Sequence, residues 1–228
     1  MYVRAGSLCL SDLGIAEKVL GKAAFNRLVE YLFASPACRV SLLISGKSDI
    51  NALAGYWGKG GREELIKPLL KSLAKVPGGA EIDVAELLPD FARLRLYRYP
   101  QDESAEPVAN PKDCIYSAMN FFRATPDTNF FNTNYLQEVL GRDYEAASDA
   151  PTFGDLIVMQ EENGEIIHMC VYIAANLVFT KNGASHTQPW TLMRIEDTAR
   201  GYYGNKAPGP MQLLRLKQAD PPSQPASG

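Results

Sequence analysis

The sequence has few histidines and few cysteines, and the common zinc-binding spacings CxxC and HExxH are absent. Only His168 and His186 occur among 228 residues, together with four cysteines that are scattered along the chain. Such scattering differs from the disulfide framework of a small secreted domain. His168-x-Cys170 could form a metal site with Cys114, but hydrolytic zinc sites favour histidine and carboxylate ligands. We therefore expect no metal and no cofactor.

Long apolar runs and a large excess of one charge are also missing. No apolar stretch reaches the ~18 residues that a membrane-spanning helix needs, and residues 1–12 lack the apolar core of a signal peptide. The net charge is only -3, so the chain as a whole does not attract nucleic acid. We predict no nucleic-acid partner and no membrane partner, and we expect the protein in the cytoplasm.

Apolar residues are present in the amount that a packed core requires, at 46% of the chain. Over residues 1–100 their spacing is mostly helical, which predicts a mainly helical N-terminal region. Arg39–Ile44 is short enough to be either a buried strand or a helical turn. The helices expected in this region span residues 15–32, Ile50–Tyr56, Glu63–Ala74 and Ile82–Leu96, the last interrupted by Pro89.

The pattern changes after residue 100. Residues 101–109 are polar and contain proline, which indicates a linker or a surface loop. Residues 110–217 have an α+β pattern, in which Asn163-Gly164 favours a tight hairpin turn. Residues 218–228 are rich in proline and serine, which predicts a disordered tail. Besides a helix at Asn134–Leu140, the predicted strands are Leu156–Met159, Ile166–Ile173, Leu177–Thr180, Thr191–Ile195 and Gln212–Leu216.

Cys114 lies at the start of a predicted helix. Asn110-Pro111 is a typical helix start, with asparagine as the N-cap and proline at the first helical position. Asp113 could cap the helix instead, and either choice leaves Cys114 in the first turn. Unpaired amide N–H groups and the helix dipole favour a thiolate there, and His168 on a later strand can accept the proton. The pattern thus predicts a cysteine nucleophile with a histidine partner.

Three short motifs follow one another along the second half of the chain, Asp113-Cys114, Gly154-Asp155-Leu156 and His168-x-x-x-Tyr172. In this order and spacing, residues 110–217 resemble the NlpC-type papain-like cysteine hydrolases. The resemblance implies a papain-like antiparallel sheet with the nucleophile helix packed on it. It also implies the activity of a cysteine peptidase, that is, a thiol protease, or of an amidase. Val178–Gly183 and Pro189-Trp190 resemble segments of bacterial proteins and imply no activity.

The resemblance and thiol chemistry together suggest a cysteine-dependent hydrolase or transferase acting on peptide-like amide bonds. Cys114 is expected to attack an amide or ester carbonyl, with its own backbone N–H contributing to an oxyanion hole. His168 is expected to act first as the base and then as the acid for the leaving group. The expected partner is a peptide or a peptide-like small substrate. The alternative is a non-catalytic module that binds a protein or peptide on the same scaffold.

A third residue should orient the imidazole. A hairpin centred near Ala175 places Asn182 opposite His168 on the next strand. Asn182 is our choice, because a neutral amide can hold the ring in papain-like sites. Thr180 and Lys181 remain alternatives, since a shift of one residue in the register changes the face on which a side chain lies.

Overall fold

The computed structural model describes residues 2–4, 7–9, 13–32, 37–100, 112–185, 188–204 and 209–217. The chain divides into two compact units, Met1–Ser35 and Pro36–Gly228. Several predicted features lie outside the described residues, namely the linker 101–109, the helix start Asn110-Pro111, the tail 218–228 and His186.

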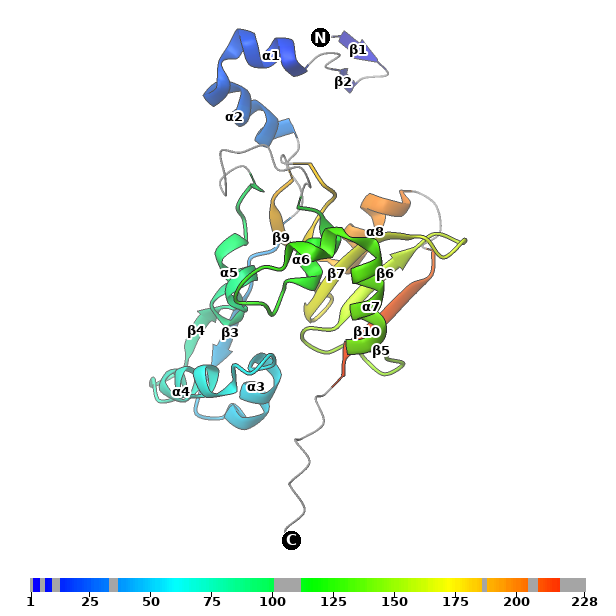
Figure 1. Cartoon of the computed structure of the whole chain (residues 1–228). Helices are drawn as coiled ribbons and strands as arrows, with labels where there is room; N and C mark the ends of the chain where they lie inside the picture. The colour runs from blue at the N-terminus through cyan, green and yellow to red at the C-terminus, as the bar shows by residue number, and fades with distance from the viewer. Residues whose placement is uncertain are drawn as a thin grey trace. The chain divides into compact units, whose positions relative to one another are not determined.

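The first unit contains a short hairpin and two helices. β1 (Tyr2–Arg4) pairs antiparallel with β2 (Ser7–Cys9). α1 (Leu13–Leu20) and α2 (Lys22–Leu32), blue in Figure 1, are separated only by Gly21. The φ of Gly21 is 73°, a left-handed conformation that glycine adopts without steric cost. The predicted helical stretch is therefore confirmed, but as two helices.

The second unit begins with a small two-stranded sheet and a pair of helices. β3 (Ser41–Ile44) pairs antiparallel with β4 (Ala80–Asp83). Between these strands in the sequence lie α3 (Ile50–Trp57) and α4 (Glu63–Ala74), which pack against each other in Figure 1. Both helices are confirmed where the apolar spacing predicts them. From the sequence, Arg39–Ile44 is expected to form either a buried strand or a helical turn, and the structure has a strand there, β3.

The prediction of a helix over Ile82–Leu96 is wrong in its first part. Ile82 belongs to β4 and pairs with β3. A single-turn 3-10 helix, η1 (Val84–Leu87), follows, and α5 (Asp90–Arg95) begins only after Pro89. The extended conformation at Ile82 is stabilised by a partner strand far away in the sequence, and local apolar spacing carries no information about that partner.

An antiparallel sheet of six strands forms the larger part of the second unit. Its strand order is β5-β10-β6-β7-β8-β9, and every neighbouring pair is antiparallel. This arrangement of separate helices and antiparallel strands confirms the α+β class. The strands span Tyr144–Ala146 (β5), Leu156–Gln160 (β6), Ile166–Ala174 (β7), Leu177–Lys181 (β8), Trp190–Arg194 (β9) and Met211–Leu216 (β10). The accompanying helices are α6 (Cys114–Met119), η3 (Thr128–Phe131), α7 (Thr133–Asp143) and α8 (Ile195–Tyr203).

The strands predicted in this half are confirmed to within one residue at each end, and so is the Asn-Gly hairpin. In that turn the Gly164 amide donates to the Glu161 carbonyl at 2.9 Å. The predictions missed β5 and α8. β5 has only three residues, too few to show a periodicity. α8 begins directly at the end of β9, so its first apolar residue, Ile195, was assigned to the strand.

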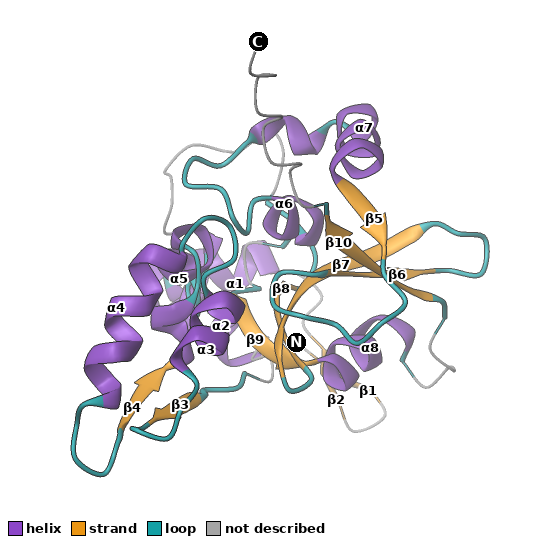
Figure 2. Cartoon of the chain, turned by 90° about the horizontal axis from the view of Figure 1, so that it is seen from below, coloured by secondary structure: helices purple, strands orange, loops and turns teal. Residues whose placement is uncertain are grey.

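The central strand β7 presents alternate side chains to two separate apolar clusters. Met169 and Val171 belong to the larger cluster, which also contains side chains of α6 and of residues 44–96. Cys170 and Tyr172 belong to the smaller cluster, together with side chains of α8. Figure 2 shows α6 and α7 on one side of the sheet and α8 on the other. We refer to these two sides as the α6 face and the α8 face.

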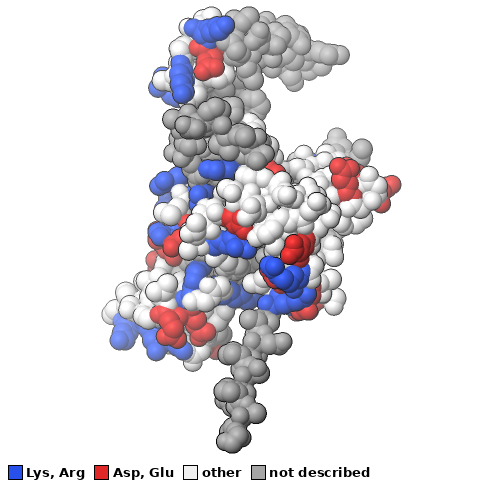
Figure 3. All heavy atoms as spheres, viewed as in Figure 1, with Lys and Arg blue, Asp and Glu red and all other residues white. Residues whose placement is uncertain are grey.

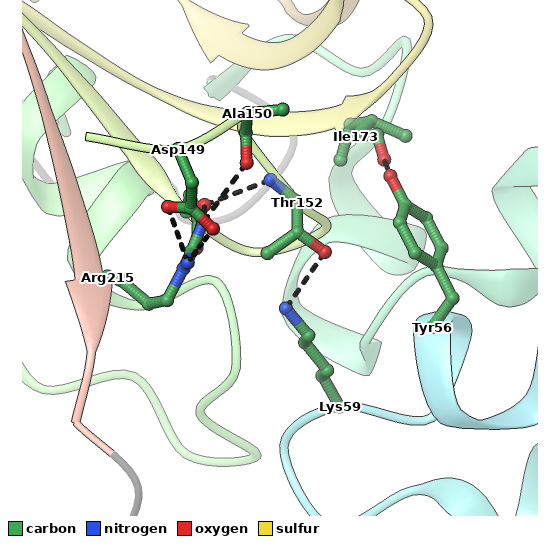
Figure 4. A network of polar contacts seen from close by, with 8 residues as sticks. Tyr56, Lys59, Asp149, Ala150, Thr152, Ile173 and Arg215 are labelled. Atoms are coloured by element: carbon green, nitrogen blue, oxygen red, sulfur yellow. Dashed lines mark hydrogen bonds and ion pairs between the residues drawn. The ribbon is translucent and has the colours of Figure 1, made fainter. Parts of the chain in front are cut away.

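Asp155 of the Gly-Asp-Leu motif braces the turn before β6. Its side chain is almost fully buried, and its carboxylate accepts a hydrogen bond from the Thr152 amide at 2.9 Å. Arg215 of β10 donates to Asp155 at 2.7 Å and to Asp149 at 2.8 Å (Figure 4). Lys59, which follows α3, donates to the Thr152 hydroxyl at 3.1 Å (Figure 4). This bond connects the segment after α3 to the turn before β6. The motif therefore has a structural role here.

Acidic and basic side chains are interspersed on the surface drawn in Figure 3, and neither sign dominates that view. Oppositely charged side chains also form ion pairs on the surface, as Arg39 and Asp83 do at 3.0 Å. None of the helices in the described ranges is long and apolar enough to cross a membrane.

Candidate functional site

Cys114 is the first residue of α6, and Asp113 caps the helix. The Asp113 carboxylate accepts a hydrogen bond from the Tyr116 amide at 2.8 Å. The Ser117 hydroxyl donates to the Asp113 carbonyl at 2.6 Å and fixes the same turn. Of the two predicted caps, Asp113 is the one observed. The thiol is thereby held at the end of the helix where backbone amides lack intrahelical partners.

The thiol of Cys114 is largely buried, and opposing influences act on its pKa. The residue is 8% exposed. Burial raises the pKa of the thiol, whereas a hydrogen bond from the Met169 backbone amide lowers it, and the negative charge of Asp113 raises it further. The thiol is therefore protonated at neutral pH. Because Met169 directly follows His168, this contact places the thiol against the strand that carries the predicted base.

The thiol meets β7 at the point where β7 and β8 stop pairing. Ladder pairs join the two strands only as far as Val171 and Phe179. The Tyr172 amide donates to Asp155 on the β6 side of β7 at 2.8 Å. Since successive amides of a strand point to opposite neighbours, the Met169 amide points to the β8 side. On that side it makes no ladder pair with β8, and it lowers the pKa of the Cys114 thiol.

His168 is fully buried on the α8 face, where Thr180 and Asn182 fix its tautomer. The Nε2 atom of His168 lies 2.9 Å from the Thr180 hydroxyl oxygen. That hydroxyl donates to Asn182 Oδ1 at 3.2 Å, and the amide nitrogen of Asn182 donates to Met193 Sδ at 3.0 Å. Because Thr180 gives its one proton to Asn182, it can only accept from His168. Nε2 therefore carries the ring hydrogen, and Nδ1 carries the lone pair.

The Nδ1 atom of His168 has no hydrogen-bond partner among the described residues. The imidazole stacks on the ring of Tyr202 in α8, with ring centroids 4.1 Å apart. Burial lowers the pKa of His168 to about 3, so the imidazole is neutral at neutral pH. The described arrangement thus leaves the thiol and the imidazole uncharged and without a hydrogen bond between them.

The three residues considered for orienting the imidazole occupy different places. Thr180 makes the direct contact with His168, and Asn182 lies behind it in the same chain of hydrogen bonds. Lys181 projects to the α6 face, where it is fully buried and its ammonium donates to two carbonyl oxygens of the following turn at 2.8 and 2.9 Å. The alternation of β8 explains this separation, because odd and even residues of a strand face opposite sides.

Tyr202 stacks on His168 and also lines a large open cavity of about 760 Å³. Burial raises the pKa of Tyr202, and the negative charge of a Cys114 thiolate raises it further, so this hydroxyl lies within electrostatic reach of the thiol. The sequence reasoning missed Tyr202 because it missed α8. Besides Tyr202, the cavity is lined by Glu161, Glu162, Asn163, Gly201, Tyr203, Gly204 and Gly209.

The other described cysteines are also free thiols. Cys170 is almost fully buried and Cys38 is half-buried, as expected for thiols that serve packing. The side chain of Cys9 lies outside the described part of the chain. Within that part, no group of three or more histidine, cysteine or carboxylate side chains could hold a metal ion.

No protein-family model matches this chain, and no curated protein matches it. The resemblance to NlpC-type hydrolases therefore rests on the three motifs and their order.

Proposed function

We propose that this protein is a cysteine-dependent hydrolase or transferase that acts on peptide-like amide bonds and is built on an NlpC-like, papain-like scaffold. The observation that carries the proposal is the position of the Cys114 thiol. It lies at the capped start of α6, where the backbone amide that follows His168 is close enough to lower the pKa of the thiol. The tautomer of His168 supports the proposal as well, because its Nδ1 lone pair is free to accept the thiol proton.

In the proposed reaction, Cys114 gives its proton to Nδ1 of His168 while its sulfur attacks the carbonyl carbon of the substrate. The oxyanion of the tetrahedral intermediate accepts a hydrogen bond from the Cys114 backbone amide. His168 then returns the proton to the leaving amine, and a thioester remains on Cys114. Water in a hydrolase, or an amine in a transferase, attacks the thioester and restores the thiol. Asn182 acts through Thr180 to hold the imidazole in place.

A peptide or a peptide-like small molecule is the substrate class that we propose. The open cavity of about 760 Å³ is of a size typical for such ligands, and Tyr202 both lines it and stacks on His168. We propose no nucleic-acid partner and no membrane partner. We also propose a cytoplasmic location, because free thiols such as Cys114 and Cys170 suit a reducing compartment.

A non-catalytic module that binds a protein or peptide is the second candidate. The burial of both reacting groups favours it, since His168 is fully buried with a pKa of about 3 and Cys114 is protonated at rest. Structural cysteines and histidines in a core have the same properties. A scaffold that resembles an enzyme does not guarantee its chemistry.

The rate of alkylation of Cys114 by iodoacetamide, measured by mass spectrometry from about pH 4 to about pH 9, separates the two candidates. In the enzyme, Cys114 should react well below pH ~8.5, the ordinary pKa of a free thiol, and His168→Ala should slow the reaction. Cys38, a half-buried free thiol of the same chain, is the internal control, and its labelling should not change in the variant. Slow labelling of Cys114 that is unaffected by His168→Ala would support the binding module.

A further inference from the structure

Beneath the first turn of α6, three neighbouring strands contribute a row of buried side chains on the α6 face. Lys181 of β8 pairs with Trp190 of β9 in the sheet. Lys181 and Met169 each lie two residues beyond the last ladder pair of β7 and β8, so the row continues to Met169 of β7. All three side chains are fully buried. We call Met169, Lys181 and Trp190 the buried row.

The first turn of α6 contacts the buried row on both sides of Lys181. At one end, α6 packs on β7, and the Met169 backbone amide lowers the pKa of the Cys114 thiol. At the other end, the indole N–H of Trp190 donates to the Ser117 hydroxyl at 2.8 Å. Between these contacts, the Lys181 ammonium lies 5.9 Å from the centre of the Trp190 ring. The lysine is therefore placed under the same helical turn that carries the thiol.

The surroundings of Lys181 are unusual for a buried cation. Its ammonium donates to the carbonyl oxygens of Gly183 and Ser185, at 2.8 and 2.9 Å, and both of these acceptors are neutral. Burial lowers the pKa of Lys181 to about 8, while the negative charges of Asp113 and of a Cys114 thiolate raise it. A buried charge is costly unless an opposite charge compensates it. A thiolate at Cys114 would supply that compensation.

We propose that Lys181 is a positioning residue of the thiol site, whose buried ammonium stabilises the thiolate of Cys114 and thereby assists its nucleophilic attack. This inference rests on the proposed nucleophilic role of Cys114 and adds a cation on the face opposite His168. Among the described groups for which an electrostatic interaction with the thiol is resolved, Lys181 is the cation. The others are Asp113 on α6, Cys170 on β7 and Tyr202 on α8.

The pH profile of Cys114 alkylation tests the inference in Lys181→Met, with Lys181→Arg as the variant that keeps the charge. Lys181→Met should move the midpoint of the profile up by about one pH unit, which makes labelling roughly tenfold slower on the rising part of the curve. Lys181→Arg should stay near the parent. Lys59→Met, which removes a half-buried lysine bound to Thr152, is the matched control and should leave the profile unchanged. A Lys181→Met profile equal to that of the parent would overturn the inference.

A second measurement leaves Lys181 in place, in case Lys181→Met does not fold, which thermal unfolding would reveal. The coupling between two sites is reciprocal, so a negative charge at position 114 should raise the pKa of Lys181, and Cys114→Asp, which supplies a carboxylate, should raise it relative to the neutral Cys114→Ser. The titration can be followed by NMR of protein with isotope-labelled lysine, and an unchanged titration would contradict the inference. Labelling of Cys114 that depends on His168 but not on Lys181 would overturn this inference alone. Labelling that depends on neither residue would also remove the proposed function.

Discussion

His168 and Lys181 lie on adjacent strands near one thiol, and both are fully buried, but they occupy opposite faces of the sheet. His168 contacts Thr180 and Tyr202 on the α8 face, whereas Lys181 contacts Trp190 and neutral carbonyl groups on the α6 face. Burial lowers the pKa of both, to about 3 and about 8. At neutral pH the histidine is therefore neutral and the lysine is mostly charged. In the proposed reaction, the thiol therefore has a proton acceptor on one face of the sheet and a cation on the other.

The largest effect that we expect on stability comes from protonation of His168 in acid. Its pKa is about 3 in the folded chain and about 6.5 when unperturbed, so between these values the unfolded chain binds more protons. The free energy of unfolding should therefore fall as the pH falls from about 6.5 to about 3, at about 1.4 kcal/mol per pH unit from this group. Urea unfolding at several pH values measures the slope. His168→Gln should reduce it, and an equal slope in both proteins would contradict the burial of a neutral histidine.

Lys181 should have a weaker effect on the free energy of unfolding, and this effect should appear at alkaline pH. Its pKa is about 8 in the folded chain and 10.5 when unperturbed, so the unfolded chain again binds more protons between these values. The free energy of unfolding should therefore rise with pH from about 8 to about 10.5, by up to ~3 kcal/mol. Lys181→Met should lack this rise, and Lys59→Met should keep it. A rise that persists in Lys181→Met would mean that Lys181 is not the group responsible.

Variants of Thr180 test the hydrogen bond of His168 on the α8 face and leave the side chains of the α6 face unchanged. Thr180→Val removes the acceptor for the Nε2–H of His168 and leaves that buried donor unpaired, so we expect a loss of about 1–3 kcal/mol in the free energy of unfolding. The tautomer of His168 is then no longer fixed, and the dependence of Cys114 alkylation on His168 should weaken. Thr180→Ser keeps the hydroxyl and should behave like the parent in both measurements. Equal behaviour of the valine and serine variants would show that the hydroxyl is not needed.

The smallest expected effect concerns the bond between Trp190 and Ser117 on the α6 face. A double-mutant cycle of Trp190→Phe and Ser117→Ala isolates this bond, and the coupling in the free energy of unfolding should be about 1 kcal/mol. Chemical denaturation of the four proteins measures it. A coupling near zero would mean that the bond does not help to seat the first turn of α6 on the buried row.

Features that depend on neighbours in the sequence could be predicted well. The cap at Asp113, the turn at Asn163-Gly164 and the alternation of β7 are local, since each follows from the conformations and hydrogen bonds of a few consecutive residues. The helix assigned to Ile82 fails for the opposite reason, because a distant strand stabilises the extended chain there. α8 was missed as well, and with it Tyr202, which stacks on His168.

The sequence by itself determined that Cys114 begins a helix, that His168 follows on a strand, and that Thr180 and Lys181 take opposite sides of β8. These properties come from capping and from the two-residue period of a strand, which are local. Only the tertiary structure decided where the β7–β8 ladder ends and that the thiol occupies this point. It alone also decided which groups are buried, and hence which are charged, because burial and the pKa shifts that it causes depend on elements brought together from distant parts of the chain.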